Sequence, residues 1–201
     1  MTTIRSVKER FREFLPIVID IETAGTNYQT DALLEICAIP LEINETTGQW
    51  KPQAPIHHHI EPFKGANLCK KSLDFIGMQD PYHPFRFAKT EKEMLNILFA
   101  AINKLLKKHN CKRAVLVGHN AWFDLTFLKA AWQRCKMNAP FHSFTSFDTA
   151  TLGGLIYGET VLAKICHTAG IKFDAGEAHS ALYDAEKTAE LFCKIINEYD
   201  T

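Results

Sequence analysis

The stretch Pro16-Ile17-Val18-Ile19-Asp20-Ile21-Glu22-Thr23-Ala24-Gly25 decides the fold of this chain. Its apolar, mostly β-branched start predicts a buried strand, and Asp20 and Glu22, two residues apart, project from the same face of that strand. Two buried like charges are costly unless a cation neutralises them, and oxygen ligands suit magnesium or manganese. The alternative is a strand end whose two carboxylates simply face water.

The composition is that of a globular protein. The 201 residues are 46% hydrophobic and 23% charged, which predicts one domain over 1–201 and excludes extensive disorder. The formal net charge is zero, so nucleic-acid binding would need a local concentration of basic residues. Six scattered Cys residues indicate reduced thiols, and neither a signal peptide nor a membrane span is recognisable. We therefore expect a soluble cytoplasmic protein that makes no membrane contact.

Two further strands are predicted directly after the first. Residues 33–41 and 51–61 alternate in the manner of strands, and the short turns between them indicate an antiparallel meander. The second of these segments contains the run His57-His58-His59, which raises the question of a metal site. Because neighbouring residues point to opposite faces of a strand, the three imidazoles cannot converge on one ion, and we do not predict a site there.

A continuously apolar segment, 114–118, predicts a central parallel strand that is covered on both faces. His119-Asn120 follows at once, with Asn120 as the expected N-cap of a helix that extends to about residue 136. Asp124 then falls in the first turn of this helix, where the helix dipole favours an anion. It would join Asp20 and Glu22 if the two strands are neighbours.

The remaining pattern predicts helices at 90–109 and about 160–169, a short helix within the long loop 63–84 at about 70–75, and a last helix that ends near residue 199. His179 and Asp184 flank the start of the last helix. Five residues apart, they would not share a helix face, so His179 is expected in the preceding loop, from which it can reach over a site that includes Asp184.

Basic residues gather in two places. Arg10 and Arg12 belong to an amphipathic segment predicted as helical over 4–15, and Lys107 and Arg113 lie in the densest basic patch, at and just beyond the end of the 90–109 helix. The plain interpretation is a solvated charged surface. The more specific interpretation is a surface that binds the phosphates of a nucleic acid.

Asp20, Glu22, Asp124, Asp184 and His179 together favour one chemistry. Four carboxylates suit two divalent ions that support in-line phosphoryl displacement. Histidine suits the role of general base, since its unperturbed pKa near ~6.5 leaves the imidazole largely neutral at physiological pH. The sequence contains no GxSxG, P-loop or dinucleotide-binding motif.

Three segments then resemble the motifs of the DEDDh 3′-to-5′ exonucleases: Asp20-Ile21-Glu22-Thr23, His119-Asn120-x-x-Phe123-Asp124 and Ala178-His179-x-x-x-x-Asp184. Further segments, including Glu61-Pro62-Phe63-x-Gly65-Ala66-Asn67-Leu68 and Phe147-Asp148-Thr149-Ala150, resemble the ribonuclease T family from about residue 10 to residue 197. The resemblance implies an α/β, ribonuclease H-like exonuclease fold with a mixed five-stranded sheet flanked by helices.

The same resemblance implies an activity and its ligands. The implied activity is the trimming of single-stranded 3′ ends of tRNA and other stable RNAs, with release of nucleoside 5′-monophosphates. Activity on single-stranded DNA is implied as well. Two Mg²⁺ ions per active site, with Mn²⁺ as a substitute, would be held by Asp20, Glu22, Asp124 and Asp184, and His179 would be the general base. A homodimer is implied, in which basic residues of one subunit serve the active site of the other.

Matching positions extend to the substrate contacts. The resemblance places Phe75, Phe123 and Phe144 against terminal bases, and Arg10, Arg12, Lys107 and Arg113 in the basic segments. Two residues depart from the family pattern: Thr26 stands in place of another stacking Phe, and Lys71 in place of a Glu that contacts a base. The preference for the 3′-terminal base therefore stays open.

Two other functions compete with this one. A proofreading-type DNA exonuclease of the DEDDh group would share the same five residues. A catalytically inactive nucleic-acid-binding module would be expected to lack at least one carboxylate or the histidine, and all five are present.

Overall fold

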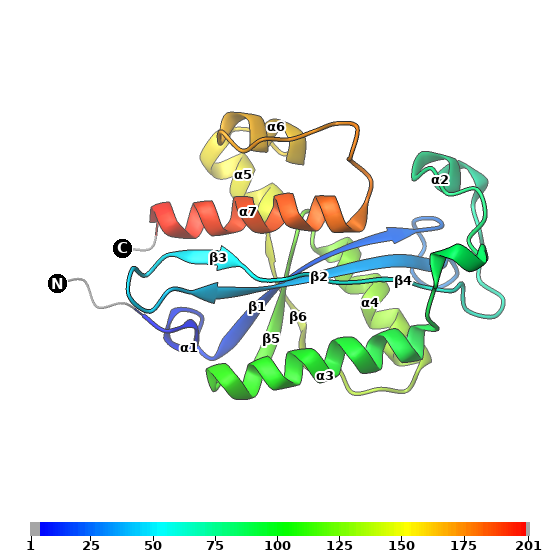
Figure 1. The fold of residues 1–201 in the computed structure, drawn as a ribbon, viewed down its shortest axis with the longest axis horizontal. Coiled ribbons are helices and arrows are strands. Elements are labelled where there is room, and N and C mark those ends of the chain that lie inside the picture. The colour runs from blue at the N-terminus through cyan, green and yellow to red at the C-terminus, as the bar shows by residue number, and fades with distance from the viewer. Residues whose placement is uncertain (1–4, 200–201) are drawn as a thin grey trace.

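A computed structural model describes residues 5–199, which form a mixed β-sheet with helices on both faces (Figure 1). In chain order the elements are α1 (Val7–Arg10), β1 (Phe14–Thr23), β2 (Leu33–Ile43), β3 (Trp50–Pro52), β4 (Ile56–His59), α2 (Lys70–Phe75), the 3₁₀-helix η1 (Pro84–Arg86), α3 (Glu91–His109), β5 (Arg113–Gly118), α4 (Trp122–Arg134), β6 (Phe141–Asp148), α5 (Thr149–Tyr157), α6 (Leu162–Thr168) and α7 (Ala181–Tyr199).

The strand order is β3-β2-β1-β5-β6, and β4 pairs with β2 as well. β2 runs antiparallel to β1, β3 and β4, whereas β5 is parallel to both β1 and β6. The predicted meander and the predicted parallel character of β5 are both confirmed, and β5 pairs with β1, which meets the condition under which Asp124 would join Asp20 and Glu22. The sheet has six strands rather than the expected five, because the predicted third strand is split into β3 and β4. The separating segment, 53–55, contains Pro55, which lacks a backbone N–H for the ladder.

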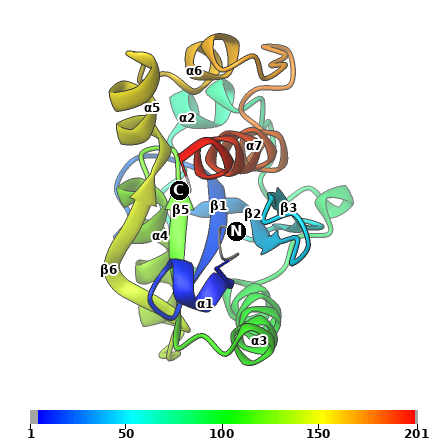
Figure 2. The same cartoon turned by 90° about the vertical axis from the view of Figure 1, so that its left-hand side faces the viewer.

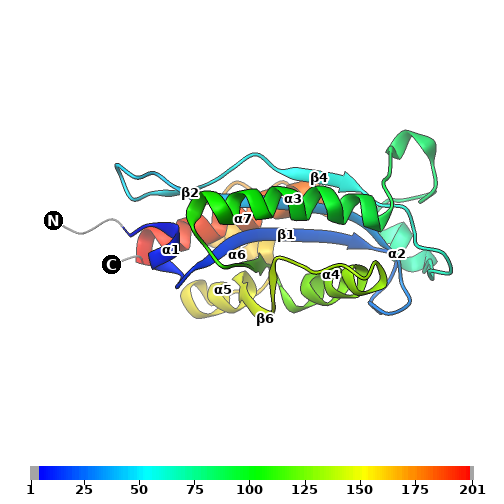
Figure 3. The same ribbon diagram turned by 90° about the horizontal axis from the view of Figure 1, so that it is seen from below.

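Helix α7 covers one face of the sheet over β1, β2 and β3, with α5 and α6 beyond it, and α3 and α4 pack on the other face (Figures 1 and 3). The interior of β1 from Leu15 to Ile19 is fully buried, as expected for a central strand with cover on both sides. Among residues 5–199, no helix has the length and apolar character needed to cross a membrane.

The N-terminal segment differs from its predicted form. A helix over 4–15 was expected, but residue 4 lies outside the described residues and α1 spans only Val7–Arg10. The chain leaves the helix because Arg12 and Glu13 adopt left-handed backbone angles, with φ of 50° and 70°. The Phe11 ring packs against Trp50 and Phe147, so this side chain joins the core instead of continuing the apolar face of a helix.

Candidate active site

Asp20 and Glu22 lie near the C-terminal end of β1, beyond the part of the strand that pairs with β5. The β1–β5 register extends to Val18, and the β1–β2 register becomes irregular between Glu22 and Thr23. The strand then turns away, held by a hydrogen bond that the Thr23 hydroxyl donates to the Gly25 carbonyl at 2.6 Å. The two carboxylates are therefore presented on one face at the end of a rigid strand.

Asp184 and Asp124 approach Asp20 from two helix starts. Among the described residues, the carboxylates close enough to share one ion are Asp20, Glu22 and Asp184, and Asp124 acts on Asp20 electrostatically. Asp184 lies in the first turn of α7, and its carboxylate has an oxygen within 4.8 Å of oxygens of Asp20 and Glu22. Asp124 is buried in the first turn of α4, as predicted, where the backbone N–H groups of Asp124 and Ile21 lower its pKa against the larger effect of burial. Helix α4 begins one residue later than expected: Ala121 is its N-cap, and Asn120 takes a left-handed angle with φ of 60°.

The charges of this carboxylate cluster, Asp20, Glu22, Asp124 and Asp184, repel one another strongly in the absence of a cation. Burial, followed by the charges of Asp124, Asp184 and Glu22, holds the pKa of Asp20 well above its ordinary value. Burial and the charges of Glu35 and Asp184 raise the pKa of Glu22 to about 8. Burial likewise raises the pKa of Asp124 and of Asp184. A site of this kind suits a divalent cation bound by oxygen ligands.

His179 lies in the loop before α7, as the five-residue spacing predicted. Its backbone adopts a left-handed conformation with φ of 68°, and its N–H donates a hydrogen bond to Asp184 Oδ2 at 3.1 Å. The exposed ring of His179 contacts the ring of Phe75, with centroids 4.2 Å apart. The hydrogen bond to Asp184 and the ring contact with Phe75 thus hold the strained backbone of His179 at the edge of the carboxylate cluster.

A pocket of about 400 Å³ opens beside Glu22. Phe75, on α2, and Phe123, at the start of α4, both line it, and so do Thr26 and Lys71, the two positions that depart from the family pattern. Phe144 lies elsewhere: it is 81% exposed on the edge strand β6, with its ring 4.4 Å from that of His142. The structure therefore brings two of the three predicted stacking residues together within one chain.

The four predicted basic residues lie at the opposite end of the sheet. Arg10 and Arg12 precede β1, Lys107 is near the end of α3, and Arg113 pairs with Phe14 at the start of β1 (Figures 1 and 2). Six residues of strand separate Phe14 from Asp20, which corresponds to about 20 Å. None of the four can reach the carboxylate cluster of its own chain.

Two positioning residues near the site were not predicted. The Asp148 carboxylate accepts hydrogen bonds from the amides of Asn120 and Ala150, at 3.1 and 2.8 Å. His119 lies 3.0 Å from the Thr149 hydroxyl and 2.9 Å from the Thr160 carbonyl oxygen. Together they fix the turn that delivers Asp124. The position of Asp148 directly before a helical segment is the signal that identifies it as a cap.

The His57-His58-His59 run also differs from expectation. Alternation does separate His58 from its neighbours, so the three imidazoles do not converge. His57 and His59, however, both face Glu35 on β2, and these three residues have potential ligand atoms within 4.8 Å of one another. The prediction that the three imidazoles do not converge is confirmed, and the predicted absence of a metal site stays a prediction. The unexpected feature is the third potential donor, which comes from the paired strand.

Comparison with known proteins agrees with this geometry. Residues 17–192 match the exonuclease family RNase_T. Over 198 residues the chain is 56% identical to ribonuclease T of Vibrio vulnificus, covering 98% of this chain and 91% of that protein. It is 54% identical to ribonuclease T of Vibrio cholerae, covering 96% of this chain and 87% of that protein. This chain belongs to the ribonuclease T family. It is a 3′-to-5′ exoribonuclease, and like its exonuclease family it depends on divalent metal ions.

Solved structures show the same fold at low sequence identity. The nuclease domain of 3′hExo, a DEDDh family member bound to rAMP, is 18% identical with a TM-score of 0.69, covering 92% of both chains. E. coli exonuclease I in complex with a dT13 oligonucleotide is 14% identical with a TM-score of 0.69, covering 92% of this chain and 41% of that chain. The chain therefore has the exonuclease fold, as predicted.

Proposed function

We propose that residues 1–201 form one exonuclease domain that trims single-stranded 3′ ends of tRNA and other stable RNAs, releases nucleoside 5′-monophosphates and also acts on single-stranded DNA. One observation carries this proposal: the carboxylate cluster lies beside a pocket of about 400 Å³ flanked by Phe75 and Phe123. A pocket for a terminal base next to the reacting bond favours removal of end nucleotides. The relatives at 52–56% identity are named ribonuclease T, which favours RNA over a proofreading role on DNA.

The carboxylate cluster fits two magnesium ions, with manganese as a substitute. Its donors are all oxygen atoms, and the raised pKa values of Asp20 and Glu22 reflect charges that a cation would neutralise. Asp20, Glu22, Asp124 and Asp184 would hold the ions. When bound, they supply Lewis-acid stabilisation of the phosphate and of the leaving oxygen.

His179 is proposed as the general base that accepts the proton of the attacking water. The backbone N–H of His179 donates a hydrogen bond to Asp184 Oδ2, and its exposed ring contacts Phe75, which lines the pocket. Because the ring is exposed on a loop, it can move over a bound 3′ end.

Phe75 and Phe123 are proposed to stack on the terminal bases, a contact worth roughly 1 to 3 kcal/mol per base. Thr26 and Lys71 line the same pocket and supply a hydroxyl and an ammonium group there. These groups are proposed to set the preference for the 3′-terminal base. Comparing 3′ ends that differ only in the last base, with wild type and with Lys71→Glu, tests this role.

The main test uses a 5′-labelled RNA hairpin with a short 3′ tail and magnesium, read at nucleotide resolution on a denaturing gel. We expect stepwise shortening from the 3′ end that halts near the duplex. Asp20→Asn should abolish it while leaving the circular dichroism spectrum unchanged, whereas Asp80→Asn, in an exposed loop, should trim like wild type. Binding without trimming, with either magnesium or manganese, would instead favour the inactive binding module.

We further propose that the chain works as a homodimer. Arg10, Arg12, Lys107 and Arg113 are too far from the carboxylate cluster of their own chain to touch a terminal nucleotide bound there. Beside the two N-terminal arginines is an apolar groove of about 820 Å³, lined by side chains of the N-terminal segment, β6, α5 and α7. Leu155 on its rim is 81% exposed. Covering this groove with a second copy would bring the basic residues of one chain toward the site of the other.

Mixing two inactive variants tests that arrangement. Asp20→Asn removes the site, and a variant with Arg12→Ala and Arg113→Ala removes the patch. If the patch acts in trans, mixing equal amounts restores about a quarter of the active sites, because heterodimers then join one intact site with one intact patch. No recovery after confirmed subunit exchange, or a monomer in sedimentation, would refute the proposal.

A further inference from the structure

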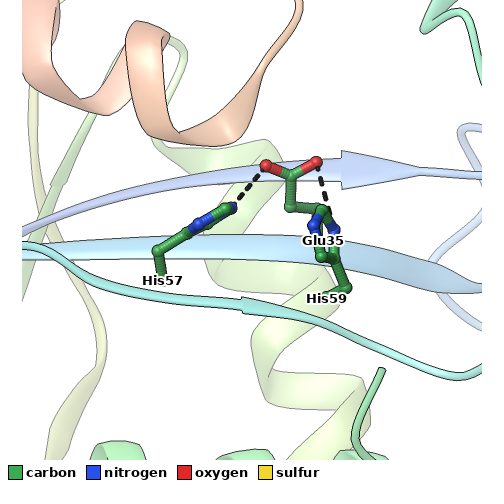
Figure 4. Close-up of side chains that lie close together, drawn as sticks. All are labelled: Glu35, His57 and His59. Atoms are coloured by element: carbon green, nitrogen blue, oxygen red, sulfur yellow. Dashed lines mark hydrogen bonds and ion pairs between the residues drawn. The ribbon is translucent and has the colours of Figure 1, made fainter. Parts of the chain in front are cut away.

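A second cluster of metal-ligating side chains lies on the same face of the sheet as the carboxylate cluster. In the register of β1, β2 and β4, Glu22 pairs with Glu35, which in turn pairs with His59 (Figure 4). Directly paired residues share a face, and strands are about 4.8 Å apart, so His59 is two strands, or about 10 Å, from Glu22. This second cluster consists of Glu35, His57 and His59.

The three side chains of the second cluster converge. His57 Nε2 lies 2.7 Å from Glu35 Oε1, and His59 Nδ1 lies 3.8 Å from Glu35 Oε2 (Figure 4). All three donor atoms fall within 4.8 Å of one another, and Glu35 is only 8% exposed. His59 Nδ1 is buried and, within the described part of the chain, has no hydrogen-bond partner. A buried imidazole nitrogen that faces a carboxylate without bonding to it leaves a position for another atom.

We propose that Glu35, His57 and His59 bind a zinc-type transition metal ion, at a site separate from the carboxylate cluster. Two imidazole nitrogens and one carboxylate oxygen are a ligand set that zinc uses, whereas an all-oxygen set selects magnesium. The spacing of two histidines at alternate strand positions places both on one face, and the third ligand comes from the neighbouring strand. Three protein ligands leave a fourth position for water or a substrate group.

The side-chain contacts of the Glu35 carboxylate are with His57, to which it is hydrogen-bonded at 2.7 Å, and with His59. Arg86 is the cation that acts on it electrostatically, but Arg86 donates its hydrogen bonds to the backbone carbonyls of Leu34, Ile60 and Pro81. An ion held by this second cluster would bind the four-residue strand β4 to β2, and would place a positive charge next to Glu22.

Zinc binding to the apo protein, measured by equilibrium dialysis with excess Mg²⁺ present to occupy the carboxylate cluster, tests the proposal. We expect one zinc per chain and a rise in melting temperature. His57→Ala and His59→Ala should each lose this zinc and the rise, while Asp20→Asn should keep both. His58→Ala is the matched control, since His58 belongs to the same strand but faces away, and it should bind like wild type.

A second measurement covers the case in which a histidine variant is unstable. X-ray absorption at the zinc edge of the loaded wild-type protein should show two imidazole ligands and oxygen, and His59→Gln, which keeps a polar side chain, should reduce the imidazole count to one. An all-oxygen shell, zinc that disappears in Asp20→Asn, or equal binding by His57→Ala and His58→Ala would each overturn the proposal. None of these outcomes bears on whether the protein trims RNA.

Discussion

Replacing Glu22 by Gln should stabilise the metal-free protein at alkaline pH. Burial and the charges of Glu35 and Asp184 raise the pKa of Glu22 from 4.5 to about 8. The folded protein therefore holds this proton more tightly than the unfolded chain does. The resulting stability is fully present below pH 4.5 and is lost as the pH rises through about 8. Gln cannot ionise, so the variant escapes this loss.

The whole pKa difference corresponds to about 5 kcal/mol of unfolding free energy, at about 1.36 kcal/mol for each pH unit. Glu22 is partly exposed. Solvent screening therefore reduces the expected effect to roughly 2 to 3 kcal/mol. Below pH 4.5 the protonated Glu and the amide are nearly isosteric, so the two proteins should be equally stable.

Urea unfolding in the presence of a chelator, followed by tryptophan fluorescence, measures this difference at both ends of the pH range. Glu61→Gln, which changes an exposed glutamate, should follow the wild-type profile. Added magnesium should restore the free energy of unfolding of the wild type above pH 8. It should stabilise Glu22→Gln less, because this variant lacks one carboxylate ligand. If the free energies of wild type and Glu22→Gln stay parallel from below pH 4.5 to above pH 8, the electrostatic account of the carboxylate cluster is wrong.

Expected outcomes for four further variants follow from the same geometry. In steady-state assays, Phe123→Ala should raise KM for RNA roughly 5- to 150-fold, the cost of losing one stacked base, with little change in kcat. Phe75→Ala should raise KM and also lower kcat, because Phe75 contacts the His179 ring. Gly25→Ala should lower stability by about 1 to 3 kcal/mol in thermal melts. The reason is that its Cβ would lie 2.0 Å from Asp31 Oδ2, so the loop after β1 must shift. Arg113→Ala should weaken RNA binding equally for all 3′-terminal bases and reduce the slope of log K against log salt by about 0.7, as filter binding over a salt series can measure.

Local patterns were sufficient to predict the carboxylate cluster. Asp20 and Glu22 follow from strand alternation, Asp124 from its place after a buried strand, and the loop position of His179 from its spacing to Asp184. Each of these inferences depends on a few neighbouring residues in one element. The apolar character of residues 114–118 predicted a central parallel strand, but its position next to β1 was left as a condition and is given by the structure.

Features that depend on long-range register were not predictable from such patterns. The second cluster exists only because β4 pairs with β2 so that Glu35 is opposite His59, and no local period encodes that pairing. The short N-terminal helix likewise depends on tertiary contacts, since Phe11 packs on Trp50 and Phe147 from distant strands. Local periodicity predicted a longer helix because it contains no information about these distant contacts.

The charge distribution explains why a chain of zero net charge can act on a polyanion. The carboxylate cluster and the predicted basic residues lie at opposite ends of β1, about 20 Å apart, which exceeds the Debye length of about 8 Å at physiological ionic strength. The basic residues therefore do little to attract RNA to the site of their own chain, where carboxylates repel it until metal is bound. Under the proposed dimer, each site gains its positive charge from the partner. Substrate capture should then depend on protein concentration and on salt together, and diluting the enzyme below its dimer dissociation constant should remove most of the salt dependence of kcat/KM.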